Sequence, residues 1–473
     1  MSIRTIQISG LRGFADTQTL DLAIPDNEKN GSGLTVLVGP NNGGKSTVVE
    51  ALKALSYPQP TSFAIGRRNQ RAGSKVALRA VDQNGAGFLL RTVDGGGSET
   101  IWEKPGEPPS IFVLPSRRFF SPWFGQHTGQ TRHGYITGNA LPGQRGNVIN
   151  EFAGRLFAIQ KDRGRFDELL NKVLDPLPTW TIDQSDAGYF LRFEVKGAYH
   201  SSEGLGEGLV SLLFIVDALY DAPDGSTVVI DEPELSLHPS VLRKLSALFS
   251  EWSKTHQLVL ATHSAYFVDL HDIVSGSQVA RVYLQDSECR ISALSRDTVD
   301  ELDGFLKNLH NPHVFGTDAR EVFFLSDGII LVEGQDDVIF YRRIAHQLDK
   351  CFAGDFFGWG VGGAGNMTAI AGLLKDLGFA KVVGILDANK IETLKLLTKK
   401  FPEYQFFPIP ADDVRSKPAR DAVPAVSGLL DEKGTLKAEY KDETVKLIDR
   451  VNEALSNSAS ANPKTLSFSD SNR

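Results

Sequence analysis

A glycine-rich loop is the feature that most constrains this 473-residue chain. Residues 39–47 read Gly-Pro-Asn-Asn-Gly-Gly-Lys-Ser-Thr, between an apolar strand pattern at 34–38 and a helical pattern at 46–55. Glycines let the backbone curl so that its N–H groups face phosphate oxygens at the positive end of a helix. Lys45 is spaced to reach the β- and γ-phosphates, and the Ser46 hydroxyl to hold Mg²⁺. A glycine-rich turn that happens to contain Lys-Ser is the alternative, but the flanking strand and helix favour a nucleoside triphosphate site. The predicted ATP-binding residues here are Gly39, Asn41, Asn42, Gly43, Gly44, Lys45, Ser46 and Thr47.

Composition sets the class of protein. The length exceeds one hydrophobic core, so two or three domains are expected. No apolar run approaches the roughly 20 residues that span a bilayer, and the N-terminus has the pattern of a first strand, not of a signal peptide. Two cysteines, Cys289 and Cys351, cannot form a disulfide framework, which favours a cytoplasmic protein. The net charge is −8, so any nucleic-acid contact must use local basic patches or bound metal.

The pattern along the chain predicts two α/β units. Buried strands of an α/β sheet are expected at 4–9, 34–38, 228–230 and 258–261. Short strands between turn residues predict antiparallel hairpins at 57–110, and a helical pattern covers 145–176. In the second half we expect strands at 328–332 and 381–386, with helices at 336–348 and 368–377. A charged helix is expected at 435–455, followed by a frayed or disordered tail at 456–473.

Two further segments carry the chemistry of phosphate hydrolysis. The strand at 228–230 ends in Asp231 and Glu232, where Asp231 would join the Mg²⁺ shell and Glu232 would polarise the attacking water. Any buried strand can end in Asp-Glu, but beside the phosphate loop these acids form a catalytic pair. His263 follows a second apolar strand. A structural histidine is the alternative, but the strand, the Thr-His-Ser setting and the distance from Glu232 favour a sensor of the γ-phosphate.

These segments, with Ile-Ser-Gly-Leu-Arg-Gly-Phe at 8–14, resemble the ABC-type ATPases of the SMC and RecF group. The resemblance implies a head-to-head dimer, with each nucleotide between one subunit's phosphate loop and the other's signature segment. Residues 201–208 correspond to that signature, although they depart from Leu-Ser-Gly-Gly-Gln. Gly206 and Gly208 lie at the start of a helix, where backbone N–H groups can bind an anion. An ordinary loop and helix start is the alternative.

The same resemblance assigns two more loops. Ser236, Leu237 and His238 would form the loop exchanged across the dimer. For the glutamine loop, Gln126 and Gln130 are candidates.

The second half places acids at the ends of two strands. Glu333 follows the apolar strand at 328–332, and Asp387 follows the strand at 381–386. Adjacent strands of a parallel sheet end at one edge, so the two carboxylates are expected to share a divalent cation. Oxygen ligands with water favour Mg²⁺ or Mn²⁺. Solvated caps of two helices are the alternative.

This layout resembles a TOPRIM domain, the metal-binding module of topoisomerases, primases and certain nucleases. By that resemblance Glu333 is its invariant acid, Asp337 the acid of Glu-Gly-x-x-Asp, and Asp387 the first acid of Asp-x-Asp. The second acid of that pair is Asn389 here, whose amide oxygen is a weaker metal ligand than a carboxylate.

The segment 409–417 contains candidates that could supply the charge missing at Asn389. Asp412 and Asp413 are candidates to supply the missing charge, and Lys417 to stabilise a phosphate transition state. A solvated loop is an equal alternative for all three residues.

An ABC-type ATPase domain followed by a TOPRIM domain (Rossmann-like) resembles the OLD family, which includes the nuclease subunit of Gabija anti-phage systems and effectors linked to some retrons. The resemblance implies an α/β protein with an ATPase domain at 1–318, in which 57–200 is an insertion of antiparallel strands and helices. A TOPRIM domain at 326–420 and a C-terminal helix and flexible tail at 421–473 follow. The implied function is an ATP-regulated, divalent-metal-dependent DNA endonuclease of anti-phage defence, acting as a homodimer or higher homo-oligomer.

Other functions stay open. The chain could be an ATP-dependent DNA clamp or phage sensor with a catalytically weak TOPRIM domain. It could also be a nuclease that acts on RNA or works only with a defence-system partner protein or a retron nucleic acid. Arginines that could meet a phosphate backbone, or equally lie in a subunit contact or an ordinary surface loop, are Arg67, Arg68, Arg71, Arg117 and Arg118.

Overall fold

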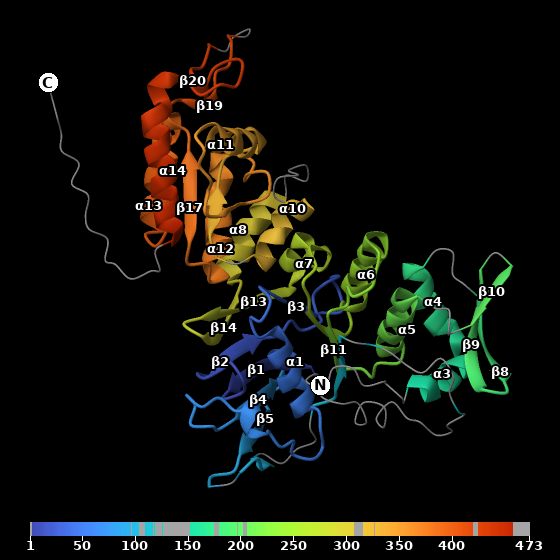
Figure 1. Ribbon diagram of the computed structural model, residues 1–473. Helices are drawn as coiled ribbons and strands as arrows, with labels where there is room; N and C mark the ends of the chain where they lie inside the picture. Colours follow the sequence, from blue (N-terminus) through green and yellow to red (C-terminus); the bar gives the residue numbers. More distant parts are fainter. Residues whose placement is uncertain are drawn as a thin grey trace. The chain divides into compact units, whose positions relative to one another are not determined.

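A computed structural model describes residues 2–95, 97–103, 109–116, 118, 125, 152–174, 179–195, 197–201, 206–306, 316–325, 327–419 and 424–456 (Figure 1). The chain divides into two compact units. The first takes in residues 1–306 and 323–325, and the second residues 307–322 and 326–473. Several sequence predictions lie outside the described residues, namely Arg117, Gln126, Gln130, positions 202–205 of the signature and the tail beyond 456.

The first unit is built on a six-stranded sheet in the order β14-β13-β3-β12-β11-β7. Five of its strands are parallel and β14 is antiparallel to β13. The strands are β3 (Leu34–Val38), β7 (Ile111–Leu114), β11 (Thr227–Asp231), β12 (Gln257–Ala261), β13 (Gln278–Gln285) and β14 (Glu288–Ala293). The central strands β3, β11 and β12 are buried at every position, as expected of strands covered on both faces. Three of the predicted buried strands are therefore confirmed.

The fourth, predicted at 4–9, is a strand in a different sheet. Strand β1 (Ile3–Ser9) pairs antiparallel with β2 (Gln18–Asp21) and β4 (Ala77–Asp82), in a five-stranded sheet completed by β5 (Gly87–Thr92) and β6 (Thr100–Trp102). Its alternating burial pattern, with Ile6 and Ile8 inside and Gln7 partly exposed, fits a sheet covered on one face. The hairpins predicted at 57–110 belong to this sheet.

Helix α1 (Lys45–Leu55) lies between these two sheets. Its Val48, Val49 and Leu52 share one hydrophobic core with Ile6 and Ile8 of β1 and with residues of β3, β11, β12 and β13. Because ten of the eleven residues of α1 are buried, the helix that follows the phosphate loop is held from both sides. The loop itself is thereby fixed at the end of β3.

The remaining elements of the first unit include two helices in the predicted 145–176 segment, α3 (Phe152–Lys161) and α4 (Arg163–Val173). A three-stranded antiparallel sheet follows, in the order β10-β9-β8. The other elements are β8 (Thr179–Ser185), β9 (Gly188–Val195), β10 (Ala198–Ser201), α5 (Glu207–Tyr220), α6 (Pro239–Trp252), α7 (Leu270–Ser275) and α8 (Arg296–Leu306).

The second unit has a four-stranded parallel sheet in the order β16-β15-β17-β18. Ile330, Val383 and Ile385 share a core with α11 and α14, whereas a Cβ on Gly384 would lie 3.2 Å from Met367 of α12. Successive strand residues point to opposite faces, so helices cover both faces of this sheet. Its elements are β15 (Ile329–Leu331), β16 (Asp355–Phe356), β17 (Val382–Leu386), β18 (Gln405–Pro408), α10 (Thr317–Arg320), α11 (Gln335–Gln347), α12 (Met367–Asp376) and α13 (Ile391–Lys400). The four strands and helices predicted in this half are confirmed.

The C-terminal helix begins later than predicted. Helix α14 runs over Lys441–Ser456, whereas 435–437 lie beside the two-stranded sheet of β19 (Asp413–Arg415) and β20 (Gly428–Leu430). Asp431 Oδ1 accepts the Thr435 N–H at 2.8 Å, and Leu436 bridges Leu430, so local hydrogen bonds compete with helix formation there. Among the described helices, none is long and apolar enough to cross a membrane.

Candidate functional site

The phosphate loop lies between β3 and α1, as the sequence predicts. Gly39, Asn42 and Gly44 have φ values of 122°, 61° and 112°, the left-handed region in which glycine costs least. A Cβ on Gly39 would lie 2.3 Å from the carbonyl oxygen of Val282, so this glycine also lets the loop pack on β13. The geometry fits a curled backbone that presents N–H groups to phosphates.

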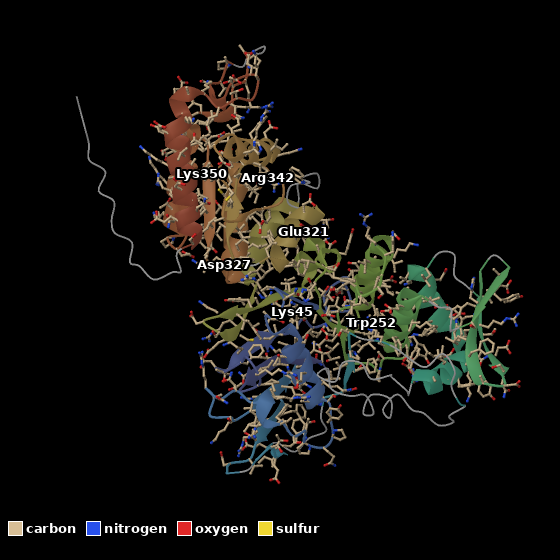
Figure 2. The ribbon with its side chains drawn as sticks, viewed as in Figure 1. Lys45, Trp252, Glu321, Asp327, Arg342 and Lys350 are labelled. Atoms are coloured by element: carbon tan, nitrogen blue, oxygen red, sulfur yellow. The ribbon has the colours of Figure 1, made fainter. Side chains whose placement is uncertain are left out.

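Lys45 is buried at the first position of α1 (Figure 2). Its Nζ donates to the carbonyl oxygens of Gly39 and Pro40 at 2.8 and 3.0 Å, so the loop's own backbone holds the ammonium in place. Burial lowers the pKa of Lys45 to about 8, although Asp231 and Glu232 act to raise it. The three predicted groups of the nucleotide site therefore interact.

The turn after β11 is strained at the predicted general base. Asp231 ends the strand and is 2% exposed. Glu232 has a φ of 48°, a conformation that non-glycine residues adopt at a cost of about 1–3 kcal/mol. Its N–H donates to the carbonyl oxygen of Ala261 at 2.7 Å, which joins this turn to the end of β12. Such strain persists only where the surroundings over-determine it, as at functional sites.

Glu234 connects the acidic turn to the predicted sensor. Its carboxylate accepts the Thr262 hydroxyl at 2.8 Å and the His263 N–H at 2.6 Å. Partial burial lowers the pKa of His263, and the positive charge of Lys45 lowers it further. Sequence reasoning missed Glu234, although it stands in the same Asp-Glu-Pro-Glu run as Asp231 and Glu232.

The two glycines of the predicted signature differ in surroundings. Gly206 caps the N-terminus of α5, and a Cβ there would meet nothing within 4 Å. A Cβ on Gly208 would lie 2.6 Å from the carbonyl oxygen of Ser236, so Gly208 serves close packing against the predicted exchange loop. The Ser236 hydroxyl also donates to Glu207 Oε2 at 2.9 Å. The anion-binding role of both glycines stays a prediction, and at Gly208 the missing side chain also permits the close approach of Ser236.

The second unit brings together the acids predicted at its sheet edge. Asp387 N lies 3.4 Å from Glu333 Oε1, since β15 and β17 are parallel neighbours. Burial raises the pKa of Asp387 to about 8, and the charges of Glu333, Asp337 and Asp413 add to it. Burial raises the pKa of Asp337 to about 6, and the negative charges of Glu333 and Asp413 contribute to the increase. The negative charges of Glu333, Asp337, Asp387 and Asp413 thus act on one another at this edge.

Asp337 and Asn389 are held by hydrogen bonds. Asp337 Oδ2 accepts the Gly334 N–H at 2.8 Å, which fixes the turn after Glu333. The Asn389 amide nitrogen donates to the Asp412 carbonyl oxygen at 2.8 Å, so Asn389 braces the loop that carries Asp413. Of the two candidates for the missing charge, Asp413 is the one whose charge acts on Asp387 and Asp337. Lys417 forms an ion pair with Asp413.

The donor set suits a hard divalent cation. It consists of carboxylate oxygens, and burial, with neighbouring negative charge adding to its effect, raises the pKa of Asp337 and of Asp387. Across the described ranges, no group of three or more His, Cys, Asp and Glu side chains is arranged to hold a metal ion. Mg²⁺ usually keeps several waters and binds through one or two carboxylates plus substrate phosphates, so Glu333 and Asp387 fit that mode of binding.

The four described arginines that were candidates for a DNA contact have partners within the chain. Arg67 Nη1 lies 3.0 Å from the buried Glu50, which Arg12 also contacts at 2.6 Å. Arg71 pairs with Glu288 at 3.1 Å. Arg68 Nη1 donates to the Gly97 carbonyl oxygen at 2.5 Å. Arg118 is half-buried and turned toward the nucleotide residues.

Comparisons with known proteins bear on both units. Two family models match the first half, an "AAA domain" over residues 5–104 and an "AAA domain, putative AbiEii toxin, Type IV TA system" over residues 137–269. A curated relative, the OLD nuclease of Thermus scotoductus (strain ATCC 700910 / SA-01), is 28% identical over 435 residues, covering 74% of this chain and 77% of its own. These matches support an OLD-family protein. The predicted resemblance and the α/β class with a P-loop ATPase-like fold are confirmed.

Solved structures similar to this chain include SMC heads. One is the Smc head domain with an extended coiled coil from Pyrococcus furiosus, bound to the C-terminal domain of ScpA (11% identity, TM-score 0.41, 66% of this chain and 100% of that one). Another is the SMC head domain from Thermotoga maritima, at 13% identity and a TM-score of 0.33. The match covers 62% of this chain and 100% of that one. At these scores they add nothing to the family-model matches.

Proposed function

We propose that this chain is an ATP-regulated, divalent-metal-dependent DNA endonuclease that acts in anti-phage defence. The observation that carries the proposal is the 3.4 Å approach of Asp387 N to Glu333 Oε1 within a cluster of four interacting carboxylates. A nucleotide site on the same chain supports the regulatory half. Similarity to the OLD nuclease supports the combination.

In the nucleotide site, the loop N–H groups and Lys45 bind the phosphates of ATP, while Ser46 and Asp231 hold its Mg²⁺. Glu232 orients a water and takes its proton as the water oxygen adds to the γ-phosphorus. The bond from that phosphorus to the β–γ bridging oxygen breaks, which gives ADP and phosphate. His263, whose backbone N–H donates to Glu234, is the proposed sensor of the γ-phosphate.

At the acidic edge, Glu333 and Asp387 hold a divalent cation, Mg²⁺ or Mn²⁺, with Asp337 and Asp413 adding negative charge nearby. When bound, the cation activates water and neutralises the scissile phosphate. Asp337 fixes the Gly334 turn, and Lys417 supplies a positive charge that can face a phosphate oxygen. DNA and a second copy of the chain are the proposed partners.

The test is cleavage of plasmid and linear DNA by purified protein. The assay crosses Mg²⁺ and Mn²⁺ with ATP, a non-hydrolysable analogue and no nucleotide. Cleavage that requires metal and changes with nucleotide supports the proposal. Intact DNA under every condition refutes it for the chain acting alone, and repetition with the products of neighbouring genes then tests dependence on a partner. Phage plating on cells with and without the gene tests the role in defence.

A second candidate function is an ATP-dependent DNA clamp or phage sensor with a catalytically weak TOPRIM domain. Asn389 favours it, because the usual second acid is missing and the amide is used as a brace. In that case nucleotide-dependent DNA retention would persist in Glu333→Gln, and no metal would produce cleavage by the native chain.

A further inference from the structure

The outermost parallel strand, β7, delivers a side chain to the edge of the sheet that holds the nucleotide residues. Strand β7 pairs in parallel with β11, with Leu114 opposite Ile230. Residues that follow Leu114 therefore emerge at the same edge as Asp231. Arg118 is four residues beyond the strand, and nothing in its sequence context singles it out from the neighbouring Arg117.

The guanidinium of Arg118 contacts two separate elements. Nη2 donates to the carbonyl oxygens of Asp231 and Glu232, at 2.5 and 3.1 Å. Nη1 donates to the Ser211 hydroxyl at 2.8 Å. Ser211 is the fifth residue of α5, the helix that begins at Glu207 after the predicted signature. A planar group with several fixed donors suits such bridging, which a lysine ammonium could reproduce only in part.

The contacted turn is the one that sets the direction of Glu232. With φ at 48°, the turn has a costly backbone conformation that must be held by its neighbours. The Ala261 carbonyl oxygen holds the turn through the Glu232 N–H, and Arg118 holds it through two carbonyl oxygens. Together they fix where the Glu232 carboxylate lies relative to Lys45, whose ammonium it influences.

We propose that Arg118 is a positioning residue for hydrolysis of the nucleoside triphosphate. It orients Glu232 and, through Ser211, makes that orientation depend on the position of α5. When the N-terminus of α5 is engaged and the helix shifts, the Arg118 side chain transmits that shift to Glu232. This inference rests on the proposed function of Glu232, but it concerns a residue that the sequence motifs do not include.

The experiment compares the full-length wild-type chain with Arg118→Met, Arg118→Ala, Arg118→Lys and Ser211→Ala. Arg165→Met, an exposed arginine on α4, is the matched control. For each variant, kcat and KM for ATP, equilibrium binding of ATP and the melting temperature are measured. A misplaced catalytic group can cost about 100-fold in rate, so Arg118→Met is expected to lower kcat by about that factor at nearly unchanged KM and binding. Arg118→Lys should recover part of the rate.

Two readouts separate positioning from mere folding. Guanidinium ion at millimolar concentration should raise kcat of Arg118→Ala and leave Arg165→Met unchanged. Ser211→Ala should lower kcat without lowering the melting temperature, because it removes only the link to α5. The inference is overturned if Arg118→Met keeps wild-type kcat, if binding, stability and rate fall together without rescue, or if Ser211→Ala turns over normally. A wild-type chain that never hydrolyses ATP refutes the proposed function itself.

Discussion

The backbone nitrogen of Asp387 lies 3.4 Å from Glu333 Oε1, although 54 positions separate the two residues in the chain. The closeness follows from the parallel register of β15 and β17, in which Leu331 is opposite Gly384. Each strand ends within a few residues of that pair, so both acids emerge at one edge. The resulting excess of negative charge is what a divalent cation would neutralise.

Glu333→Gln and Asp387→Asn are each expected to weaken binding of Mn²⁺ by at least about tenfold, because each removes a charged ligand. Isothermal titration calorimetry of the purified chain measures this affinity. Asp355→Asn, at an exposed carboxylate of β16, is the control and should bind as wild type does. Equal affinity in all three variants would place the metal elsewhere.

The neighbours Asp412 and Asp413 offer a matched comparison. Asp413 raises the pKa of Asp387, whereas Asp412 contributes its backbone carbonyl to Asn389. Asp413→Asn should therefore lower Mn²⁺ affinity by about tenfold, and Asp412→Asn by less than about twofold. The same calorimetric titration distinguishes them. A larger effect at Asp412 would mean that the other carboxylate replaces the missing acid of Asp-x-Asp.

Gly360 supports the turn behind Glu333. It has a φ of +87°, and a Cβ there would lie 2.6 Å from Gly334 Cα. Gly360→Ala should destabilise the second unit by roughly 1–3 kcal/mol and weaken metal binding, because the Gly334 backbone must move. Gly365→Ala is the control, since its Cβ would meet nothing within 4 Å. Thermal unfolding with and without Mn²⁺ measures both effects, and equal behaviour of the two variants would show that the contact is unimportant.

Local signals were sufficient to predict the phosphate loop and both acidic strand ends. At 34–55, an apolar strand, a glycine turn and a helix agree with one another, and at Glu333 and Asp387 each acid directly follows an apolar strand. Agreement between propensity and pattern makes such segments readable without tertiary information.

Features that depend on contacts between distant segments could not be predicted from the sequence. An apolar strand such as 3–9 does not reveal which sheet it joins, and β1 lies in the antiparallel sheet, not in the predicted α/β sheet. Nor does a cluster of arginines reveal the direction of each side chain. The sequence makes Arg118 a candidate for a DNA contact because it does not show which residues the side chain meets. Its partners, Ser211 and the turn at Asp231, belong to segments far away in the chain.

Lys53 predicts a pH dependence of stability in the first unit. It is 1% exposed, and burial lowers its pKa in the folded chain to about 8, below the ordinary 10.5. The unfolded chain therefore binds more protons between those values, so the free energy of unfolding rises with pH through this window. Lys53→Met should flatten that rise and stabilise the unit at pH 7 by an amount on the order of 1–3 kcal/mol.

Urea unfolding from pH 7.5 to 9.5 tests this expectation. Lys75→Met, at a side chain that is 68% exposed, is the control and should keep the wild-type slope. Burial lowers the pKa of Lys45 in the same way, so the Lys53→Met variant should keep part of the rise of the unfolding free energy with pH. An unchanged slope in Lys53→Met would show that its ammonium is solvated in the folded chain.

The most direct test of the account is a plasmid-cleavage assay with Mn²⁺ and Mg²⁺ on the wild-type chain, Glu333→Gln and Lys45→Ala, each checked for an unchanged melting temperature. The account predicts metal-dependent cleavage by the wild type, a loss of at least about 100-fold in Glu333→Gln, and an altered response to ATP in Lys45→Ala. Cleavage by Glu333→Gln at the wild-type rate would contradict it.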